Sequence, residues 1–186
     1  PDASPDLPRN YPTQFLSTAS EILYLWVARK VIAGHAFLDQ LPPAKRTPFA
    51  TCYIHATVLD SQGRRMSKSL GNGIDPIEMI DKYGADAMRF SLILLTKEGQ
   101  DTRLAVEKFE QGRNFMNKLW NAARFALGKA GRLPALPAQV TALEDRWILS
   151  RLAATIEAVG GCWERYDFND GANLLYRFTW NDVCDW

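Results

Sequence analysis

The chain has 186 residues, 47% of them hydrophobic, and a formal net charge of +1 at pH 7. This composition predicts a globular protein with one ordinary domain or two small ones, and it argues against disordered and fibrous classes. No apolar run approaches the ~18 residues needed to cross a bilayer, and the first residues carry Pro and Asp where a signal peptide has a basic and then an apolar stretch. We therefore expect a cytoplasmic protein with no membrane partner. Its near-neutral charge means that any nucleic-acid contact must use a local basic patch.

Cysteine and histidine are too few and too scattered for a metal or disulfide framework. Cys52, Cys162 and Cys184 form no C-x-x-C pair, and only His35 and His55 accompany them. Structural zinc needs four such ligands at short spacing, and a disulfide framework needs an even set of cysteines. The sequence thus predicts neither.

The first predicted elements are a helix and a strand. Residues 21–33 are apolar on nearly all sides and precede Gly34, a pattern that predicts a largely buried helix with a glycine at its C-terminal end. Residues 51–59 are β-branched and aromatic, and they lie between Pro48 and the turn-forming residues 60–63. This pattern predicts one strand followed by a turn.

Two helices are predicted after this strand. Asp75 followed by Pro76, with Glu78 three residues after Asp75, marks a capped helix start, and Gly84 marks its end. A second helix is expected over residues 85–95. The order strand, loop, helix is typical of a nucleotide-binding sheet, in which ligands collect beyond the carboxyl ends of the strands.

From residue 104 the pattern changes to long amphipathic helices. One predicted face of the first helix contains Phe109, Met116, Leu119, Trp120, Ala123 and Leu127. Residues 128–137 are a Gly/Pro-rich connection, and further helices are predicted over 143–163 and 172–186. We expect an α/β piece over residues 1–104 and an all-α helical bundle portion over 105–186. The last helical pattern has no stop signal, so we interpret the chain as a segment of a longer protein.

The most informative segment is a cationic loop at residues 63–72. It places Arg64, Arg65 and Lys68 together with the hydroxyls of Ser67 and Ser69 between two glycines. Cations and hydroxyls on a mobile loop suit the binding of phosphate, whose oxygens gain charge during ATP cleavage. The segment matches neither the P-loop nor the dinucleotide fingerprint. For a generic basic cluster, the alternative interpretation is a solvated surface turn.

The string R-M-S-K-S-L-G-N at residues 65–72 closely resembles the K-M-S-K-S signature of class I aminoacyl-tRNA synthetases, with Arg65 in place of the usual first Lys. The resemblance implies that residues 1–104 are the C-terminal part of a Rossmann-type catalytic domain and that the signature loop is 65–69. It further implies that Mg-ATP is a substrate, bound by Arg65, Met66, Ser67, Lys68 and Ser69. Lys68 takes the place of the main phosphate ligand, and Arg65 and Lys68 are the implied catalytic residues.

Residues 11–13 and 18–29 are similar to a segment of the valine-specific members of this family, and they lack the Gly-Ser-Asp-Gln run typical of isoleucyl enzymes. The resemblance implies that Glu21 meets the ATP ribose or the substrate ammonium, and that Ile22 and Trp26 line a valine pocket. Helical spacing alone favours core packing for Ile22 and Trp26. His55 has two interpretations, a contact with the nucleotide or a hydrogen-bonded core residue.

Residues 111–121 and 145–152 look like the start of the family's helical anticodon-binding domain. On this resemblance the implied tRNA-binding residues are Arg113, Lys118, Arg124 and Arg151, which would meet phosphates of tRNA(Val) without reading sequence. A solvated helix face is the alternative for each of them. The resemblance also implies that the N-terminal catalytic half, with its H-I-G-H-type motif, and the editing domain lie outside these residues. An isoleucyl-tRNA synthetase segment and a non-catalytic tRNA-binding module are the rival interpretations.

Overall fold

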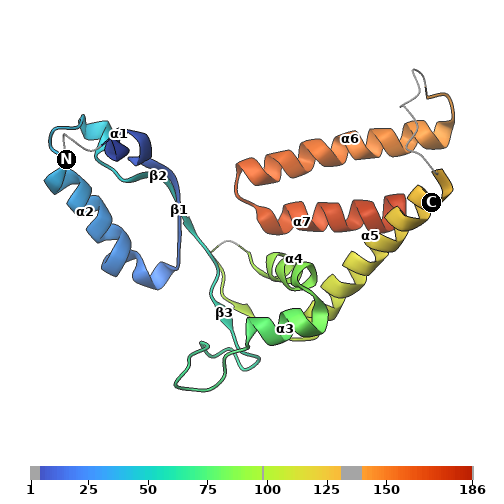
Figure 1. The fold of residues 1–186 in the computed structure, drawn as a ribbon, viewed down its shortest axis with the longest axis horizontal. Helices are drawn as coiled ribbons and strands as arrows, with labels where there is room; N and C mark the ends of the chain where they lie inside the picture. The colour runs from blue at the N-terminus through green and yellow to red at the C-terminus, as the bar shows by residue number, and fades with distance from the viewer. Residues whose placement is uncertain (1–4, 98, 131–139, 186) are drawn as a thin grey trace. The chain divides into compact units, whose positions relative to one another are not determined.

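A computed structural model describes residues 5–97, 99–130 and 140–185 (Figure 1). Contacts between residues divide the chain into two compact units. The first unit contains Pro1–Thr57 and Glu98–Gln100, and the second contains Val58–Lys97 and Asp101–Trp186. The signature loop belongs to the second unit.

The first unit is built on two parallel strands joined by a helical connection. Its elements are α1 (Asp6–Asn10), β1 (Thr13–Thr18), the 3-10 turn η1 (Ser20–Ile22), the π turn η2 (Leu23–Val27), α2 (Ala28–Phe37), η3 (Pro43–Lys45) and β2 (Phe49–Ile54). Thr13 lies opposite Phe49, and Thr18 lies opposite Ile54. Parallel neighbours require such a crossover, so this unit is a βαβ arrangement.

The helix expected at residues 21–33 differs from the prediction at both ends. It starts with 3-10 and π turns, and it continues past Gly34 to Phe37. Gly34 serves a close approach, because a Cβ there would collide with the carbonyl oxygen of Arg46 and the hydroxyl of Tyr11. The expected burial is also wrong, since Tyr24 is 86% exposed and Ile32 is 66% exposed. Two strands are too narrow a sheet to cover a helix that is apolar on all sides.

The single strand expected at residues 51–59 is in fact two strands in different sheets. β2 ends at Ile54 and pairs with β1, whereas β3 (Val58–Leu59) pairs in parallel with β4 (Thr102–Arg103). The residues between them leave the ladder, and the division between the two compact units falls at this point. A continuous β-forming pattern does not reveal which partner each half finds, because the partners are distant in sequence.

The two short helices of the second unit are confirmed. α3 (Pro76–Tyr83) starts after Asp75, whose Oδ1 accepts a hydrogen bond of 2.8 Å from the main-chain N–H of Ile77. This is the predicted N-cap. α4 (Ala85–Leu95) has the predicted bounds and follows Gly84, which adopts a φ of 93°.

Further helical elements complete the second unit: the long helices α5 (Lys108–Ala130) and α6 (Leu143–Glu164), the shorter α7 (Phe168–Arg177) and the π turn η4 (Phe178–Val183). The prediction for residues 143–163 is confirmed, while the last helix begins earlier than expected, at Phe168. Residues 131–137 of the predicted connection lie outside the described residues. Among the described helices, none combines the length and hydrophobicity that a membrane span requires.

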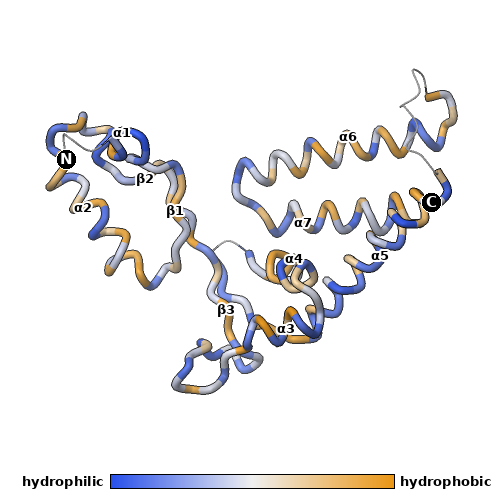
Figure 2. Tube along the Cα trace, viewed as in Figure 1, coloured by the Kyte–Doolittle hydropathy of each residue, from blue (hydrophilic) through white to orange (hydrophobic). Residues whose placement is uncertain are grey.

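The core of the second unit lies between α3, α4 and the start of α5. Its buried residues are Tyr83, Ala87, Leu104 and Phe109. Figure 2 shows that α4 is largely hydrophobic, while α5 alternates hydrophobic and hydrophilic positions along its length. Only the first half of α5 is covered, since Trp120 is 71% exposed and Leu127 is 54% exposed. The predicted continuous apolar face therefore packs at Phe109 and Met116 but is exposed at Trp120 and Leu127.

Asn169 connects α7 to the end of α4. Its buried amide Nδ2 donates hydrogen bonds to the carbonyl oxygens of Ile93 (3.1 Å) and Leu94 (2.6 Å). These carbonyls belong to the last turn of α4, where intrahelical donors are lacking. We expect Asn169→Ala to lower the free energy of unfolding by about 1–3 kcal/mol. Urea denaturation followed by circular dichroism checks this, with the exposed Asn181→Ala as control, and equal midpoints for the two variants would contradict it.

Candidate functional site

The cationic loop leaves the carboxyl end of β3 and ends at the cap of α3. In sheets of parallel strands, this edge is where ligands bind. The loop opens with a tight turn in which Asp60 N–H donates to the carbonyl of Arg64 (2.8 Å) and Gly63 adopts a φ of 79°. Leu59 and Arg65 then form an isolated antiparallel bridge. The first residues of the signature are therefore paired with the strand from which the loop departs.

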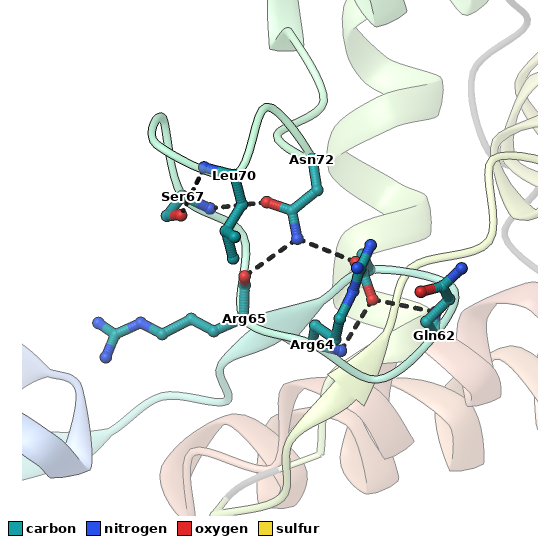
Figure 3. A network of polar contacts seen from close by, with 7 residues as sticks. Gln62, Arg64, Arg65, Ser67, Leu70 and Asn72 are labelled. Atoms are coloured by element: carbon teal, nitrogen blue, oxygen red, sulfur yellow. Dashed lines mark hydrogen bonds and ion pairs between the residues drawn. The ribbon is translucent and has the colours of Figure 1, made fainter.

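Asp60 is the centre of a polar network at the base of this loop (Figure 3). Its Oδ1 accepts hydrogen bonds from the main-chain N–H groups of Gln62 (3.0 Å) and Arg64 (2.8 Å). Its Oδ2 accepts from Arg64 Nε (2.9 Å) and Asn72 Nδ2 (2.9 Å). Asp60 is only 8% exposed. The hydrogen bond from Asn72 and those from Arg64 lower the pKa of this carboxyl to about 2, so it is ionised at neutral pH.

Asn72 connects the two ends of the loop. Besides its bond to Asp60, its Nδ2 donates to the carbonyl of Arg65 (3.1 Å), and its Oδ1 accepts from the N–H of Ser67 (2.9 Å). The amide of Asn72 thus orders the loop through its main chain. Sequence reasoning missed Asp60, which it assigned only to a turn. The available signal was an Asp three residues before a Gly, a pattern in which the carboxylate accepts bonds from the following main chain.

Met66 anchors the same stem from its apolar side. The half-buried Met66 packs against the core cluster of the second unit, as do Val58 before the loop and Ile74 after it. Apolar packing of Met66 and the Asp60–Asn72 network thus both hold residues 65–67.

The tip of the loop is exposed and carries the remaining signature residues. Ser67 Oγ accepts a hydrogen bond from Leu70 N–H (3.2 Å) and lies 3.2 Å from Ser69 Oγ. Lys68 is exposed at this tip, and Figure 3 shows the Arg65 side chain extending away from the Asp60 network. The structure therefore brings the predicted residues 65–69 together, with cations and hydroxyls on one solvent-facing turn.

The other predicted substrate-binding residues belong to the first unit. Ile22 and Trp26 are 37% and 38% exposed, so they are not the core residues that helical spacing favours. Lys30 Nζ lies 4.0 Å from the centroid of the Trp26 ring. Glu21 is exposed on η1. His55 is exposed, with Nδ1 3.0 Å from the carbonyl oxygen of Ala56, so its interpretation as a core residue is wrong.

The four predicted tRNA-binding residues lie on α5 and α6: Arg113, Lys118, Arg124 and Arg151. Three of them have partners within the second unit. The Arg113 guanidinium lies 5.9 Å from the Tyr83 ring centroid, and Lys118 Nζ lies 5.0 Å from that of Trp180. Arg151 Nε donates to Asp182 Oδ2 at 3.0 Å. Arg124 is exposed on α5.

Potential metal ligands are dispersed in the part of the chain that the structure describes. No group of three or more His, Cys, Asp or Glu side chains there is placed to hold an ion. Cys162 is buried, whereas Cys52 and Cys184 are half-buried, and all three are free thiols.

Two protein-family models match the chain. Residues 1–105 match "tRNA synthetases class I (I, L, M and V)", and residues 145–186 match "Anticodon-binding domain of tRNA ligase". The first match contains the entire cationic loop. The second covers α6 from its third residue onward, together with α7 and η4.

Curated relatives and solved structures agree with these matches. The chain is 46% identical to the valine–tRNA ligase of Fervidobacterium nodosum and 45% identical to that of Thermotoga maritima, over its whole length in both cases. It spans 21% of each of those proteins. A ternary complex of Agrobacterium radiobacter LeuRS, tRNA and LeuAMS matches 89% of the chain and 23% of that protein, with a TM-score of 0.77 and 25% identity. Mycobacterium tuberculosis methionyl-tRNA synthetase with methionyl-adenylate matches 95% of the chain and 34% of that protein, with a TM-score of 0.71.

These similarities confirm the expected fold class. The solved neighbours are synthetases, and the chain combines small parallel sheets near its N-terminus with a mostly helical remainder. The chain spans about a fifth of the length of its curated relatives. Because the first family model covers more than half of the residues, the chain belongs to the class I tRNA synthetases.

Proposed function

We propose that this chain is part of a cytoplasmic valine–tRNA ligase, which activates valine with Mg-ATP and transfers it to tRNA(Val). Similarity along the whole of this chain to ligases of that name supports the choice of valine, with identities of 42–46%. The observation that carries the catalytic part of the proposal is the loop itself, whose stem is fixed by Met66 and Asn72 while Lys68 is exposed at its tip.

In the proposed reaction, a carboxylate oxygen of valine attacks the α-phosphorus of ATP, and the bond from this phosphorus to the bridging oxygen of pyrophosphate breaks. Negative charge then accumulates on the departing pyrophosphate and on the phosphoryl oxygens. Lys68 supplies a compact, rotatable positive charge to these oxygens, and Arg65 supplies a second cation from the stem. Met66, Ser67 and Ser69 complete the ATP-binding loop. Orientation and charge stabilisation supply the catalysis, and no covalent enzyme intermediate forms.

The first unit supplies the proposed amino-acid contacts. Ile22 and Trp26 are partly exposed, and an aliphatic and an aromatic side chain suit the branched side chain of valine. Glu21 is an exposed carboxylate, suited to the ammonium of valine or the ribose hydroxyls of ATP. The exposed imidazole of His55 is the proposed contact for the adenosine part of ATP.

We further propose that residues 1–104 belong to the catalytic domain and residues 105–186 to the start of the anticodon-binding domain. Arg113, Lys118, Arg124 and Arg151 are the proposed contacts to tRNA phosphates. Lys118 and Arg151 would have to exchange their present partners, Trp180 and Asp182, for phosphate. The N-terminal catalytic half and the editing domain are the parts of the parent chain that this proposal requires elsewhere.

Amino-acid-dependent ATP–pyrophosphate exchange by the full-length protein tests the proposed function. Exchange that depends on valine supports it, whereas exchange that depends on isoleucine supports the isoleucyl alternative. A non-catalytic tRNA-binding module would bind tRNA but show no exchange with any amino acid. Nucleotide and tRNA titrations of wild type and Lys68→Ala separate the classes further, because a phosphate-binding Lys68 predicts loss of ATP binding with tRNA binding intact.

We expect the isolated 186 residues to show no valine-dependent exchange. The loop supplies only part of the charge that the transition state requires, and catalysis falls steeply when reacting groups are not held together. Exchange assays on the isolated segment and on the full-length protein, at equal molar concentration, measure the difference. Activity of the isolated segment above a no-enzyme blank would contradict this expectation.

A further inference from the structure

We propose that Asp60 is a positioning residue of the phosphate-binding loop: its carboxylate orients the Asn72 amide, and that amide holds the main chain of Arg65 and Ser67 next to Lys68. The inference deepens the proposed function and rests on it. No family resemblance used above assigns a role to Asp60.

First, both oxygens of the Asp60 carboxylate are fully engaged in hydrogen bonds. Each of its oxygens accepts two hydrogen bonds, and two of the four donors are main-chain N–H groups of the turn that follows Asp60. These short-range bonds fix the carboxylate relative to β3. Arg64 adds charge compensation with its Nε 2.9 Å from Oδ2. An ionised carboxylate accepts hydrogen bonds and donates none. Asn72 must therefore turn its NH2 group toward Asp60.

The second step follows from the shape of an amide. With Nδ2 held at 2.9 Å from Asp60, Oδ1 of Asn72 faces the other way, where it accepts from Ser67 N–H at 2.9 Å. The same Nδ2 reaches the carbonyl of Arg65 at 3.1 Å. The side chain of Asn72 thus pairs with two main-chain groups as a neighbouring strand would. The reversed amide would set its oxygen against the Asp60 carboxylate and the Arg65 carbonyl, and no acceptor would remain for Ser67 N–H.

The third step connects this geometry to the phosphate-binding residues. Arg65 and Ser67 are the two residues whose main chain Asn72 holds, and Lys68 follows Ser67 directly. Asp60 itself is nearly buried, so it acts on a ligand only through these neighbours. The low pKa of Asp60 agrees with this role, because the carboxylate keeps its charge at neutral pH. Loss of that charge should weaken ATP binding without changing the valine-binding residues of the first unit.

Steady-state exchange kinetics of the full-length enzyme test the proposal. Asp60→Asn preserves shape but places an NH2 group against the donors of Arg64 and Asn72. We expect kcat/KM for ATP to fall at least about 10-fold, with KM for valine unchanged, because the hydrogen bonds lost are made to an ionised carboxylate and are stronger than neutral ones. Asn72→Ala should have a similar effect, and the double variant should be no worse than the more impaired single variant. Asp81→Asn, on the exposed face of α3, is the matched control and should behave as wild type.

Several outcomes would overturn the proposal. An unchanged kcat/KM for ATP in Asp60→Asn removes it, and multiplied effects in the double variant show that Asp60 acts independently of Asn72. Should Asp60→Asn fail to fold, Asn72→Ala decides the matter, because it removes the amide that holds Arg65 and Ser67 and leaves Asp60 in place. An unchanged kcat/KM for ATP in a folded Asn72→Ala variant overturns the inference. Wild-type enzyme without valine-dependent exchange would instead defeat the proposed function.

Discussion

Lys68→Ala in the full-length protein is expected to reduce valine-dependent ATP–pyrophosphate exchange by about 100- to 1,000-fold, the range seen when one preorganised charge-stabilising donor is removed from an active site. Lys68 is exposed at the loop tip, so its loss should leave the folded structure intact. The charge on the departing pyrophosphate develops mainly in the transition state. The loss should therefore appear in kcat as well as in the KM for ATP.

The matched control is Lys82→Ala, an exposed lysine on α3 just beyond the loop. It removes the same charge from the same unit but lies outside the signature, so we expect exchange within about twofold of wild type, as for most surface substitutions. Thermal unfolding of both variants shows whether either has lost structure. Equal loss of exchange in the two variants would mean that general charge, and not the position of Lys68, supports the reaction.

Gly112→Ala is expected to destabilise the second unit through a single added methyl group. Gly112 of α5 is buried against α4, and a Cβ there would collide with Ser91 Oγ and the carbonyl oxygen of Ala87. The carbonyl is main chain and cannot rotate away, so the two helices must separate. Ser91 Oγ also donates to the carbonyl of Lys108 at 3.1 Å and has little freedom to move. We expect a loss of about 1–3 kcal/mol, as for other overpacked cores.

Gly128→Ala provides the control within the same helix. A Cβ at Gly128 meets no atom within 4 Å, so the substitution adds helix propensity without a clash. It should stabilise the helix by about 0.5–1 kcal/mol. Urea denaturation of both variants followed by circular dichroism measures the two changes. If the urea midpoints of both variants moved in the same direction, the contact between α4 and α5 at Gly112 would not control stability.

The elements predicted best were those defined by signals within a few residues. Asp75, Pro76 and Gly84 mark both ends of α3 by chemistry that acts over a single helical turn, and the bounds of α4 follow directly. The bonds of Asn72 are of the same local kind, since an asparagine in a glycine-rich loop favours bonds to nearby main chain. Such features depend little on the rest of the fold.

The predictions that failed depended on partners distant in sequence. Gly34 has the sequence context of a helix end, yet it is required inside α2 by Arg46 and Tyr11. The break between β2 and β3 reflects different partner strands, β1 and β4. Exposure of Trp120 in α5 likewise depends on which elements are present to cover that face. Periodicity shows that a face is apolar but does not identify what packs on it.

The residues of the candidate site also fall into two groups, those that local sequence indicates and those that depend on a partner distant in the chain. The signature residues 65–69 were recognisable because they are contiguous, whereas Asp60 acquires its role through Asn72, twelve positions later in the chain. The turn that begins at Asp60 is enough to explain an aspartate at this position. Nothing in the residues next to Asp60 indicates the further hydrogen bond from Asn72. The sequence therefore predicts the proposed phosphate-binding residues of the loop but not Asp60, which supports the loop through Asn72.

The Asn72 bond to Ser67 also limits how far Lys68, the proposed phosphate ligand, can move. Consecutive Cα atoms are about 3.8 Å apart. While its bond to Asn72 keeps Ser67 in place, the Cα of Lys68 therefore stays at that distance from a fixed Ser67 Cα. Only four residues, 68–71, span the gap to Asn72. While this bond holds, the ammonium group reaches a nucleotide by torsion of its own side chain and a small rearrangement of the tip, and a larger swing of the signature requires the bond to break.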